Sequence, residues 1–212
     1  MKAIYAIPGI AATDKLLENI KVNGCEMIVL KWPATYEGIK LEDYARMFIE
    51  QIDQTKPFYL LGVSFGGMLC SELSHMMNTE RVFLISTCKN RKELPWMLKI
   101  QKYIPLYNLF SENFLATNAS MSYRLLGFKP DYKKILVEMM SEMQPNYLKR
   151  SIKMIVNWEN TKMPKNYIHI HGSNDHLLFY SCVKADYTIQ NGSHAMIVYN
   201  AEEINELLGT LI

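Results

Sequence analysis

Three residues in this sequence are of the types that together make a serine nucleophilic. Ser64 lies in the pattern Gly62-x-Ser-x-Gly66, Asp175 follows Ile-His-Gly-Ser-Asn, and His194 follows Gln-Asn-Gly-Ser. A serine hydroxyl is a poor nucleophile by itself. It becomes a good one when a histidine takes its proton and a carboxylate orients that histidine. The sequence therefore contains the parts of an acyl-transfer site, if the fold brings them together.

The residues around Ser64 have the pattern of a sharp turn between a strand and a helix. An apolar run over 58–63 precedes the serine, and apolar residues at helical spacing follow Gly66. Glycines at 62 and 66 leave room where side chains would collide, and the helix N-terminus puts free amides where negative charge would develop. A serine in an ordinary surface loop is the alternative, but both flanks are well marked. We expect Ser64 to stand on a nucleophile elbow.

The elements before and after this turn alternate between strands and helices. Strands are predicted at 3–7, 26–30, 58–63, 82–86, 167–171 and 186–189, and helices at 14–22, 41–54 and 201–211. Strands separated by helices pair in parallel through right-handed crossovers, with helices on both faces of the sheet. The sequence therefore predicts an α/β fold in which the elbow stands at the carboxyl edge of the sheet.

The two last predicted strands end in polar turns that carry Asp175 and His194. Because the carboxyl ends of parallel strands emerge at one edge of a sheet, these side chains should meet Ser64 there. Other histidines flank the acid, but a strand histidine is more often a structural residue. Glu72 and His75, on the helix after the elbow, are interpreted as packing or surface residues. The rival histidines are His169, His171 and His176.

The segment between the fourth and fifth strands has a different character. It contains no clear strand, and Met, Leu, Tyr and Lys recur at helical spacing over 94–110, 111–126, 131–143 and 145–158. It directly follows a strand end, so it should lie over the edge where ligands bind in open α/β sheets. We predict one domain, residues 1–212, with a helical cap inserted at about 89–160.

The predicted cap carries no charge pattern that would force a polar pocket. Its aromatic and methionine side chains predict an apolar acyl pocket, with simple core packing as the alternative. The residues concerned are Trp96, Met97, Tyr103, Tyr107, Phe110, Phe114, Met121, Tyr123 and Trp158.

Composition narrows the classes of partner. The 212 residues are 49% hydrophobic, and 23 basic against 21 acidic residues give a net charge of +2 without long runs of either sign. This predicts a small-molecule substrate and neither nucleic acid nor a membrane surface as partner. No segment is long enough to span a membrane and none resembles a signal peptide, so a cytoplasmic protein is expected. The sequence leaves the oligomeric state open.

The cysteines predict neither disulfides nor a metal site. They are widely scattered and form no Cys-x-x-Cys pair, so buried free thiols are the favoured interpretation. No metal and no cofactor are expected. The cysteines are Cys25, Cys70, Cys88 and Cys182.

The segments Gly-Val-Ser-Phe-Gly-Gly, Ile-His-Gly-Ser-Asn-Asp-His and Gly-Ser-His-Ala-Met occur in this order, and with them the chain resembles the α/β-hydrolase fold superfamily, in particular its small capped serine hydrolases. The resemblance covers nearly the whole chain. It implies that Ser64 is the nucleophile, that His194 is the general base and then the acid, and that Asp175 orients the histidine.

The resemblance also implies an oxyanion hole made by two backbone amides. One belongs to Phe65, and the other belongs to the loop after the first strand, at Ile10 or at Ala11, with Ile10 preferred. In that loop Pro8 replaces the histidine of the usual His-Gly pair. Since the donor is a main-chain amide, this replacement need not remove it.

Two further departures from the family pattern concern the sheet. The first two antiparallel strands of the family are absent, which leaves a reduced sheet of six parallel strands in the order 2-1-3-4-5-6. Only about ten residues separate Asp175 from the last strand, so the edge helix there must be very short.

The resemblance implies hydrolysis of a carboxylic ester or thioester of a small apolar acyl substrate through an acyl-enzyme. The same triad supports amide cleavage, carbon–carbon hydrolysis and lyase chemistry on this fold. The alternative from another class is a ligand-binding or signalling protein that keeps the fold with little turnover.

Overall fold

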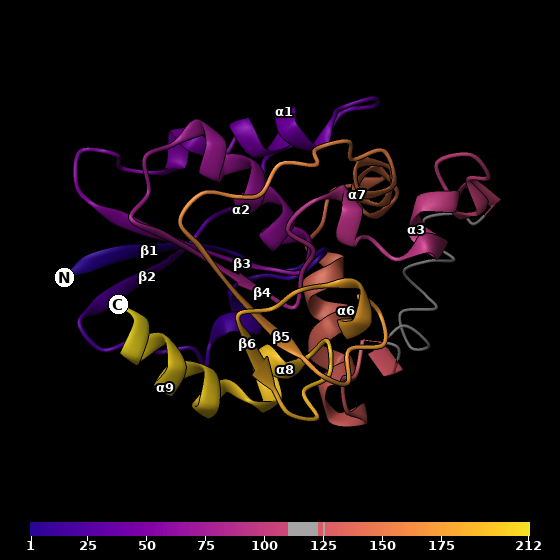
Figure 1. Ribbon diagram of the computed structural model, residues 1–212. Coiled ribbons are helices and arrows are strands. Elements are labelled where there is room, and N and C mark those ends of the chain that lie inside the picture. Colours follow the sequence, from indigo (N-terminus) through magenta and orange to yellow (C-terminus); the bar gives the residue numbers. More distant parts are fainter. Residues whose placement is uncertain (110–122, 125) are drawn as a thin grey trace.

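The computed structural model describes residues 1–109, 123–124 and 126–212. Its centre is a six-stranded sheet in the order β2-β1-β3-β4-β5-β6 (Figure 1). All neighbouring strands are parallel, so the predicted sheet and its order are confirmed. The strands are β1 (Lys2–Ile7), β2 (Cys25–Val29), β3 (Phe58–Val63), β4 (Arg81–Ile85), β5 (Tyr167–Gly172) and β6 (Tyr187–Ile189).

Helices cover both faces of the sheet. In Figure 1, α1 (Leu41–Arg46) and α2 (Phe65–Met76) lie above the sheet, and α8 (Met196–Tyr199) and α9 (Ala201–Leu211) lie below it. Successive side chains of a strand point to opposite faces, and the core divides in the same way. Tyr5 and Ile7 of β1 join the cluster beneath α2, while Ile4 and Ala6 join the cluster that packs on α9.

The register of the sheet brings three strand ends level with one another. Ile7 of β1 pairs with Gly62 of β3, and Val63 of β3 pairs with Ile85 of β4. The turns that follow these strands therefore leave the sheet at the same edge. The elbow serine follows the middle strand of the three.

Two predicted helices are much shorter than expected. In place of the helix over 14–22 there is only the 3-10 helix η1 (Asp14–Leu17). The apolar side chains of this segment are still buried, but the Asn205 side chain accepts a hydrogen bond from Lys21 N and donates one to Asn19 O. A side chain that satisfies backbone groups in this way competes with helix formation.

The predicted helix over 41–54 divides into α1 and the 3-10 helix η2 (Ile49–Gln51). The side chain of Gln51 binds both the N–H and the C=O of Lys31, at 2.9 Å each. This long-range pairing turns the segment toward the end of β2. Phe48 and Ile52 are buried as the spacing predicted.

Short helices at the carboxyl edge of the sheet make up the described part of the inserted segment (Figure 1). The predicted helix over 94–110 is interrupted before Pro105, whose ring and missing N–H disfavour a helix interior. The helix predicted over 111–126 lies outside the described residues except for 123–124 and 126. The elements are α3 (Trp96–Ile100), η4 (Leu106–Leu109), η5 (Pro130–Tyr132), α6 (Lys133–Ser141) and α7 (Tyr147–Val156).

The two ends of the inserted segment are joined at its base. Arg91 N donates to Asn160 O at 2.8 Å, and the Arg91 guanidinium donates to the carbonyl oxygens of Val156 and Trp158. The Glu72 carboxylate of α2 accepts from the Trp158 indole at 2.6 Å and from the Asn160 side chain at 2.8 Å. Glu72 thus does more than pack: its buried carboxylate anchors the segment to the helix behind the elbow.

The helix between the last two strands, after Asp175, is as short as the sequence predicted. Only the 3-10 helix η6 (Tyr180–Cys182) lies between β5 and β6.

All four cysteines are free, but only Cys70 and Cys88 are buried. The prediction of burial is wrong for Cys25, which begins the edge strand β2, and for Cys182 in η6. In the part of the chain that the structure describes, no helix is both long enough and apolar enough to cross a membrane; location in the cytoplasm stays a prediction.

Candidate active site

Ser64 has the strained backbone expected of a nucleophile elbow. Its φ of 54° lies in the left-handed region, where few residues other than glycine are found. The turn is tight enough to require the glycines on both sides. A Cβ at Gly66 would collide with the carbonyl oxygens of Ile7 and Pro8, and one at Gly62 would lie 2.5 Å from the Gly66 oxygen. The pattern around the serine therefore has a steric basis in this structure.

The carbonyl oxygen of Ser64 is fixed by three donors. The amides of Gly67 and Met68 donate to it at 3.0 and 3.2 Å, and the Thr87 hydroxyl donates at 2.6 Å. A Cβ at Gly67 would lie 2.5 Å from the Thr87 side chain, so helix α2 passes very close to the turn after β4. Sequence reasoning missed Thr87. Its only signal was a small polar residue directly after the strand that neighbours the elbow strand.

The three predicted residues meet at the carboxyl edge of the sheet. His194 Nε2 lies 2.9 Å from Ser64 Oγ, and His194 Nδ1 lies 2.7 Å from Asp175 Oδ2. All three side chains are buried or nearly so. A carboxylate accepts only, so Nδ1 carries the proton and Nε2 is free to accept the serine proton. This arrangement suits the abstraction of a proton from Ser64.

Asp175 is held by bonds to both of its oxygens. Oδ1 accepts from the amides of Leu177 and Leu178 at 2.9 Å each, and Oδ2 also lies 3.3 Å from His171 Nε2. Burial disfavours the charged carboxylate, but the side-chain hydrogen bonds from His171 and His194 outweigh it and hold the pKa of Asp175 well below its usual range. Asp175 is therefore an anion at neutral pH.

The rival histidines are not placed to act as the base. His169 and His171 lie on β5 and are fully buried, and His176 is exposed beside the acid. Among the described histidines, only His194 forms a hydrogen bond with the Ser64 hydroxyl. His171 Nε2 contacts Oδ2 of Asp175, the same oxygen that His194 contacts, and the sequence did not predict this contact.

The two predicted oxyanion donors flank Ser64. Phe65 begins α2. The first helix amides that donate to a backbone carbonyl are those of Gly67 and Met68, which bind the Ser64 oxygen. The Phe65 amide lies before this hydrogen-bonded turn, as the first amides of a helix do. Ile10 lies in a turn closed by the bond from Ala12 N to Gly9 O, at 3.0 Å. Both Ile10 and Phe65 line the same cavity as Ser64. Their role as donors stays a prediction.

A cavity of about 530 Å³ opens above Ser64 and His194. This volume is within the range of small-molecule sites. The sheet edge supplies its floor, and helices of the inserted segment supply most of its apolar wall. Side chains of that wall include Leu98 of α3, Leu136 and Met140 of α6, and Ile152 and Ile155 of α7. The cavity is suited to an apolar group next to the serine.

The apolar pocket is built largely from residues that the sequence analysis did not single out. Tyr107 and Tyr123 line it as expected. Trp96 and Met97 do not, because α3 turns Leu98 inward and leaves them 69% and 43% exposed, and Tyr103, after α3, is 78% exposed. Trp158 is buried but binds Glu72 instead. The remaining expected residues, Phe110, Phe114 and Met121, lie outside the described residues.

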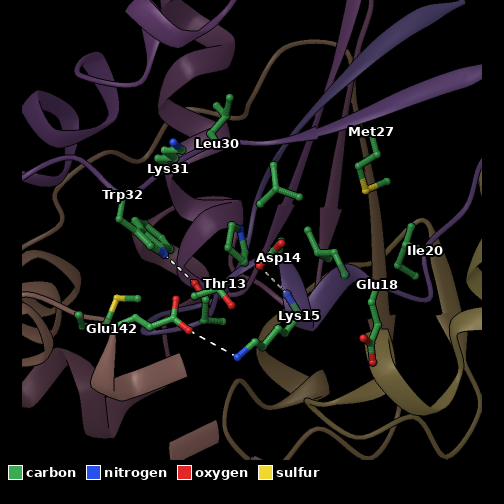
Figure 2. A pocket seen from close by; sticks show the side chains of 15 residues that line it. Thr13, Asp14, Lys15, Glu18, Ile20, Met27, Leu30, Lys31, Trp32 and Glu142 are labelled. Carbon is green, nitrogen blue, oxygen red and sulfur yellow. Dashed lines mark hydrogen bonds and ion pairs between the residues drawn. The ribbon is translucent and has the colours of Figure 1, made fainter. Parts of the chain in front are cut away.

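A second cavity, of about 820 Å³, lies beside the edge strand β2 and shares Ala12 with the first. Figure 2 shows charged side chains of both signs around it, with Lys15 directed at Glu142 and the Trp32 indole directed at the loop after β1. Neither Ser64 nor His194 lines this cavity. The two cavities therefore lie on either side of the loop after β1. The candidate nucleophile and base line only the first cavity.

Comparisons with known proteins find a likeness of structure and none of sequence. No protein-family model and no curated protein matches this chain. A lipase-esterase related protein from Clostridium acetobutylicum superposes with a TM-score of 0.70 at 15% identity, covering 100% of this chain and 94% of that one. A thermophilic esterase from Thermogutta terrifontis gives 0.72 at 12% identity, with 100% and 89% covered.

A thioesterase of the prodiginine biosynthetic pathway in Streptomyces coelicolor gives a TM-score of 0.67 at 11% identity, covering 99% of this chain and 85% of that one. At such identities the likeness concerns the fold. It extends over nearly the whole length of the chain. The chain therefore has the α/β-hydrolase fold, as its motifs predicted.

Proposed function

We propose that this protein is a serine hydrolase that cleaves a carboxylic ester or thioester of an apolar acyl group. The observation that carries the proposal is the unbroken hydrogen-bond chain from Ser64 through His194 to Asp175, with its serine end at an apolar cavity. Esterases and a thioesterase are among the proteins that share the fold, which supports the same reaction class.

In the proposed reaction His194 Nε2 takes the proton of Ser64 as Oγ attacks the substrate carbonyl. The imidazolium that forms is stabilised by the anionic carboxylate of Asp175. The backbone amides of Phe65 and Ile10 would stabilise the oxyanion, each at the start of a tight turn beside the serine. His194 then gives its proton to the leaving group, and a water molecule activated by the same imidazole hydrolyses the acyl-enzyme.

The inserted segment, at about 89–160, is proposed to act as a cap that selects the acyl group. Helices α3, α6 and α7 contribute aliphatic side chains to the cavity, and Gln101 is the one amide side chain on the described part of its wall. A charged acyl group would lose its hydration there without gaining a partner. Apolar acyl chains of medium length are therefore the substrates that fit best.

The test combines a covalent probe with a substrate panel. A fluorophosphonate should label the protein at Ser64, as located by mass spectrometry of the labelled peptide. The protein should also hydrolyse p-nitrophenyl esters or acyl-CoA thioesters from acetyl to octanoyl. Heat-denatured protein is the control for non-specific labelling.

Each outcome separates this proposal from its alternatives. Labelling elsewhere, with no labelling of Ser64, would remove the serine from the mechanism. Labelling of Ser64 without turnover of any acyl substrate would favour a ligand-binding protein or a lyase that uses the same fold.

A further inference from the structure

A buried lysine lies close to the triad without belonging to it. Lys89 follows β4 and is only 1% exposed. Its ammonium contacts Glu93 Oε1 at 2.7 Å, the carbonyl of Lys184 at 2.6 Å and His169 Nδ1 at 2.9 Å. A buried charge is costly unless all of its hydrogens find partners, and here three partners match three hydrogens. The mechanism above gives this lysine no part.

The contact with His169 begins a chain of hydrogen bonds that runs toward the acid. His169 Nε2 lies 3.3 Å from His171 Nδ1, and His171 Nε2 lies 2.8 Å from the carbonyl oxygen of Leu178. Both rings are fully buried on β5. Burial, and then the nearby Lys89 and His171, lower the pKa of His169 well below its usual value, so this ring is neutral.

The two ends of this chain fix its direction. An ammonium can only donate, so His169 accepts at Nδ1 and carries its proton on Nε2. That proton is directed at His171 Nδ1, which leaves the proton of His171 on Nε2. A carbonyl oxygen can only accept, so Leu178 independently requires the same tautomer of His171. The contacts at both ends of this hydrogen-bond chain therefore require the same tautomer of His171.

The chain ends on the loop that carries Asp175. The N–H of His171 is directed at the carbonyl of Leu178, with Asp175 Oδ2 at 3.3 Å, and the amide of Leu178 donates to Asp175 Oδ1 at 2.9 Å. Leu178 is thus held on both sides, by the histidine and by the acid. Its side chain and that of Leu177 line the cavity above Ser64.

We propose that Lys89, His169 and His171 form a directed hydrogen-bond chain that holds the acid loop and keeps the Asp175 carboxylate aimed at His194. His171 is then a positioning residue that acts through Asp175, and Lys89 sets the tautomers of both rings. The consequence for catalysis rests on the proposed function, whereas the hydrogen-bond chain itself does not.

Other titratable groups surround the chain and bear on any pH measurement. The amide of His169 donates to Asp186 Oδ2 at 2.8 Å, and the ring of Tyr180 lies 6.4 Å from that of His171. Burial raises the pKa of the Cys88 thiol well above its usual value, so it is neutral. Cys182 of η6 lies near Cys88, and Glu93 is paired with Lys89.

The first arm of the test needs no activity. In protein with ¹⁵N-labelled histidine, His169 should appear as the neutral Nε2–H tautomer, and His171 should carry a proton on Nε2. The Lys89→Met/Glu93→Gln double variant removes both members of the ion pair, and both rings should then show tautomer mixtures. Lys184→Met is the matched control, because Lys184 contributes only its backbone carbonyl. An Nδ1–H tautomer in the wild type, or no change in the double variant, would overturn the chain.

The second arm compares two replacements of His171. Phenylalanine keeps a ring but removes the N–H, whereas glutamine keeps an N–H for Leu178 and Asp175. In His171→Phe we expect kcat to fall about 10-fold with KM unchanged, because the acid is no longer held in place. His171→Gln should stay within about 2-fold of wild type.

The outcomes distinguish this proposal from the function on which it rests. A folded His171→Phe with wild-type kcat, or a His171→Gln as impaired as His171→Phe, would contradict positioning. If wild-type protein hydrolyses nothing, the proposed function fails. The ¹H resonance of His194 Nδ1–H then serves as readout: it should shift or broaden in His171→Phe and stay in place in His171→Gln. An unchanged resonance in both would overturn the proposal.

Discussion

The two walls of the cavity present different kinds of side chain to it. At the sheet edge, directed hydrogen bonds fix Ser64, His194 and Asp175, and the glycines lie where an added Cβ would collide with backbone atoms. On the cap side, aliphatic side chains of short helices contact the cavity without directed bonds. Under the proposed function, the chemistry on the sheet side depends on backbone geometry, and the selectivity on the cap side depends on side-chain volume. Substitutions on the two sides should therefore fail in different ways.

The largest effect should come from Ser64→Ala on the sheet side. The backbone and the glycines determine the elbow, while the hydroxyl performs the covalent step, so the variant should fold normally and lose about 10⁴-fold or more in kcat/KM. Hydrolysis of a p-nitrophenyl ester and thermal unfolding measure the two effects. Ser86→Ala is the matched control, since Ser86 follows the neighbouring strand with the same left-handed backbone and is also buried. Wild-type turnover in Ser64→Ala would contradict the mechanism.

Gly66→Val should disrupt the sheet side of the cavity by distorting the backbone of the elbow. A side chain at this position meets the carbonyl oxygens of Ile7 and Pro8, neither of which can move without disturbing β1. We expect insoluble protein or a large drop in the midpoint of thermal unfolding. Gly209→Val on α9, where an added Cβ meets nothing within 4 Å, controls for the substitution itself. A soluble and active Gly66→Val would show that the elbow is less tight than described.

A change on the cap side should alter selectivity and spare the chemistry. Each methylene buried in the cavity contributes about 0.8 kcal/mol, which is roughly 4-fold in kcat/KM, until the cavity is full. Leu136→Trp should fill part of the cavity and lower the octanoyl-to-acetyl ratio of kcat/KM by about 10-fold or more, with acetyl turnover preserved. The neighbouring Val137 is 48% exposed, and Val137→Trp should leave the ratio unchanged. A wild-type ratio of one would show that the cap does not select by size.

The smallest effect concerns the stability of the sheet side against pH. The pKa of His169 lies well below its ordinary 6.5 in the folded chain, because burial, then Lys89 and His171, disfavour its charge. At pH values between the lowered pKa of the folded state and 6.5, His169 binds a proton in the unfolded chain but not in the folded chain. Unfolding free energy should therefore fall as the pH is lowered through 6.5 and be flat above it, with a slope of up to about 1.4 kcal/mol per pH unit.

Urea unfolding of His169→Gln between pH 5 and pH 8 isolates this contribution. The variant should lose most of that slope, whatever happens to its absolute stability. His176→Gln, at an exposed histidine, is the matched control for the substitution itself. Equal slopes in wild type and His169→Gln would show that His169 is not held neutral.

The contrast between the walls also explains what the sequence predicted. The sheet order and the meeting of Ser64, Asp175 and His194 were predictable because parallel pairing brings strand ends to one edge, whatever the chain does in between. The same reasoning could not find His171 or Lys89. Their roles depend on which ring atoms face each other across the interior, and local patterns carry no information on that.

The cap was predicted less well for a physical reason. Periodicity indicates that a helix has an apolar side but not which side faces the cavity, so Trp96, Met97 and Tyr103 were assigned to the pocket and Leu98 was not. The predicted helix lengths were wrong where side chains bind distant backbone groups. Gln51 and Asn205 each bind both a donor and an acceptor of another segment, and sequence spacing does not reveal such partners.

The bond between Arg91 and Asn160 has a consequence for how such a protein can change. The excursion of the chain between these residues begins and ends at one point, and Glu72 secures that point to α2. A segment whose ends already meet can be lengthened, shortened or exchanged at little cost in loop closure, and without displacing the strands on either side. The sheet side of the cavity is thereby insulated from variation in the inserted segment. Under the proposed function, new acyl preferences can arise, by evolution or by grafting, in a chain whose reaction centre remains the same.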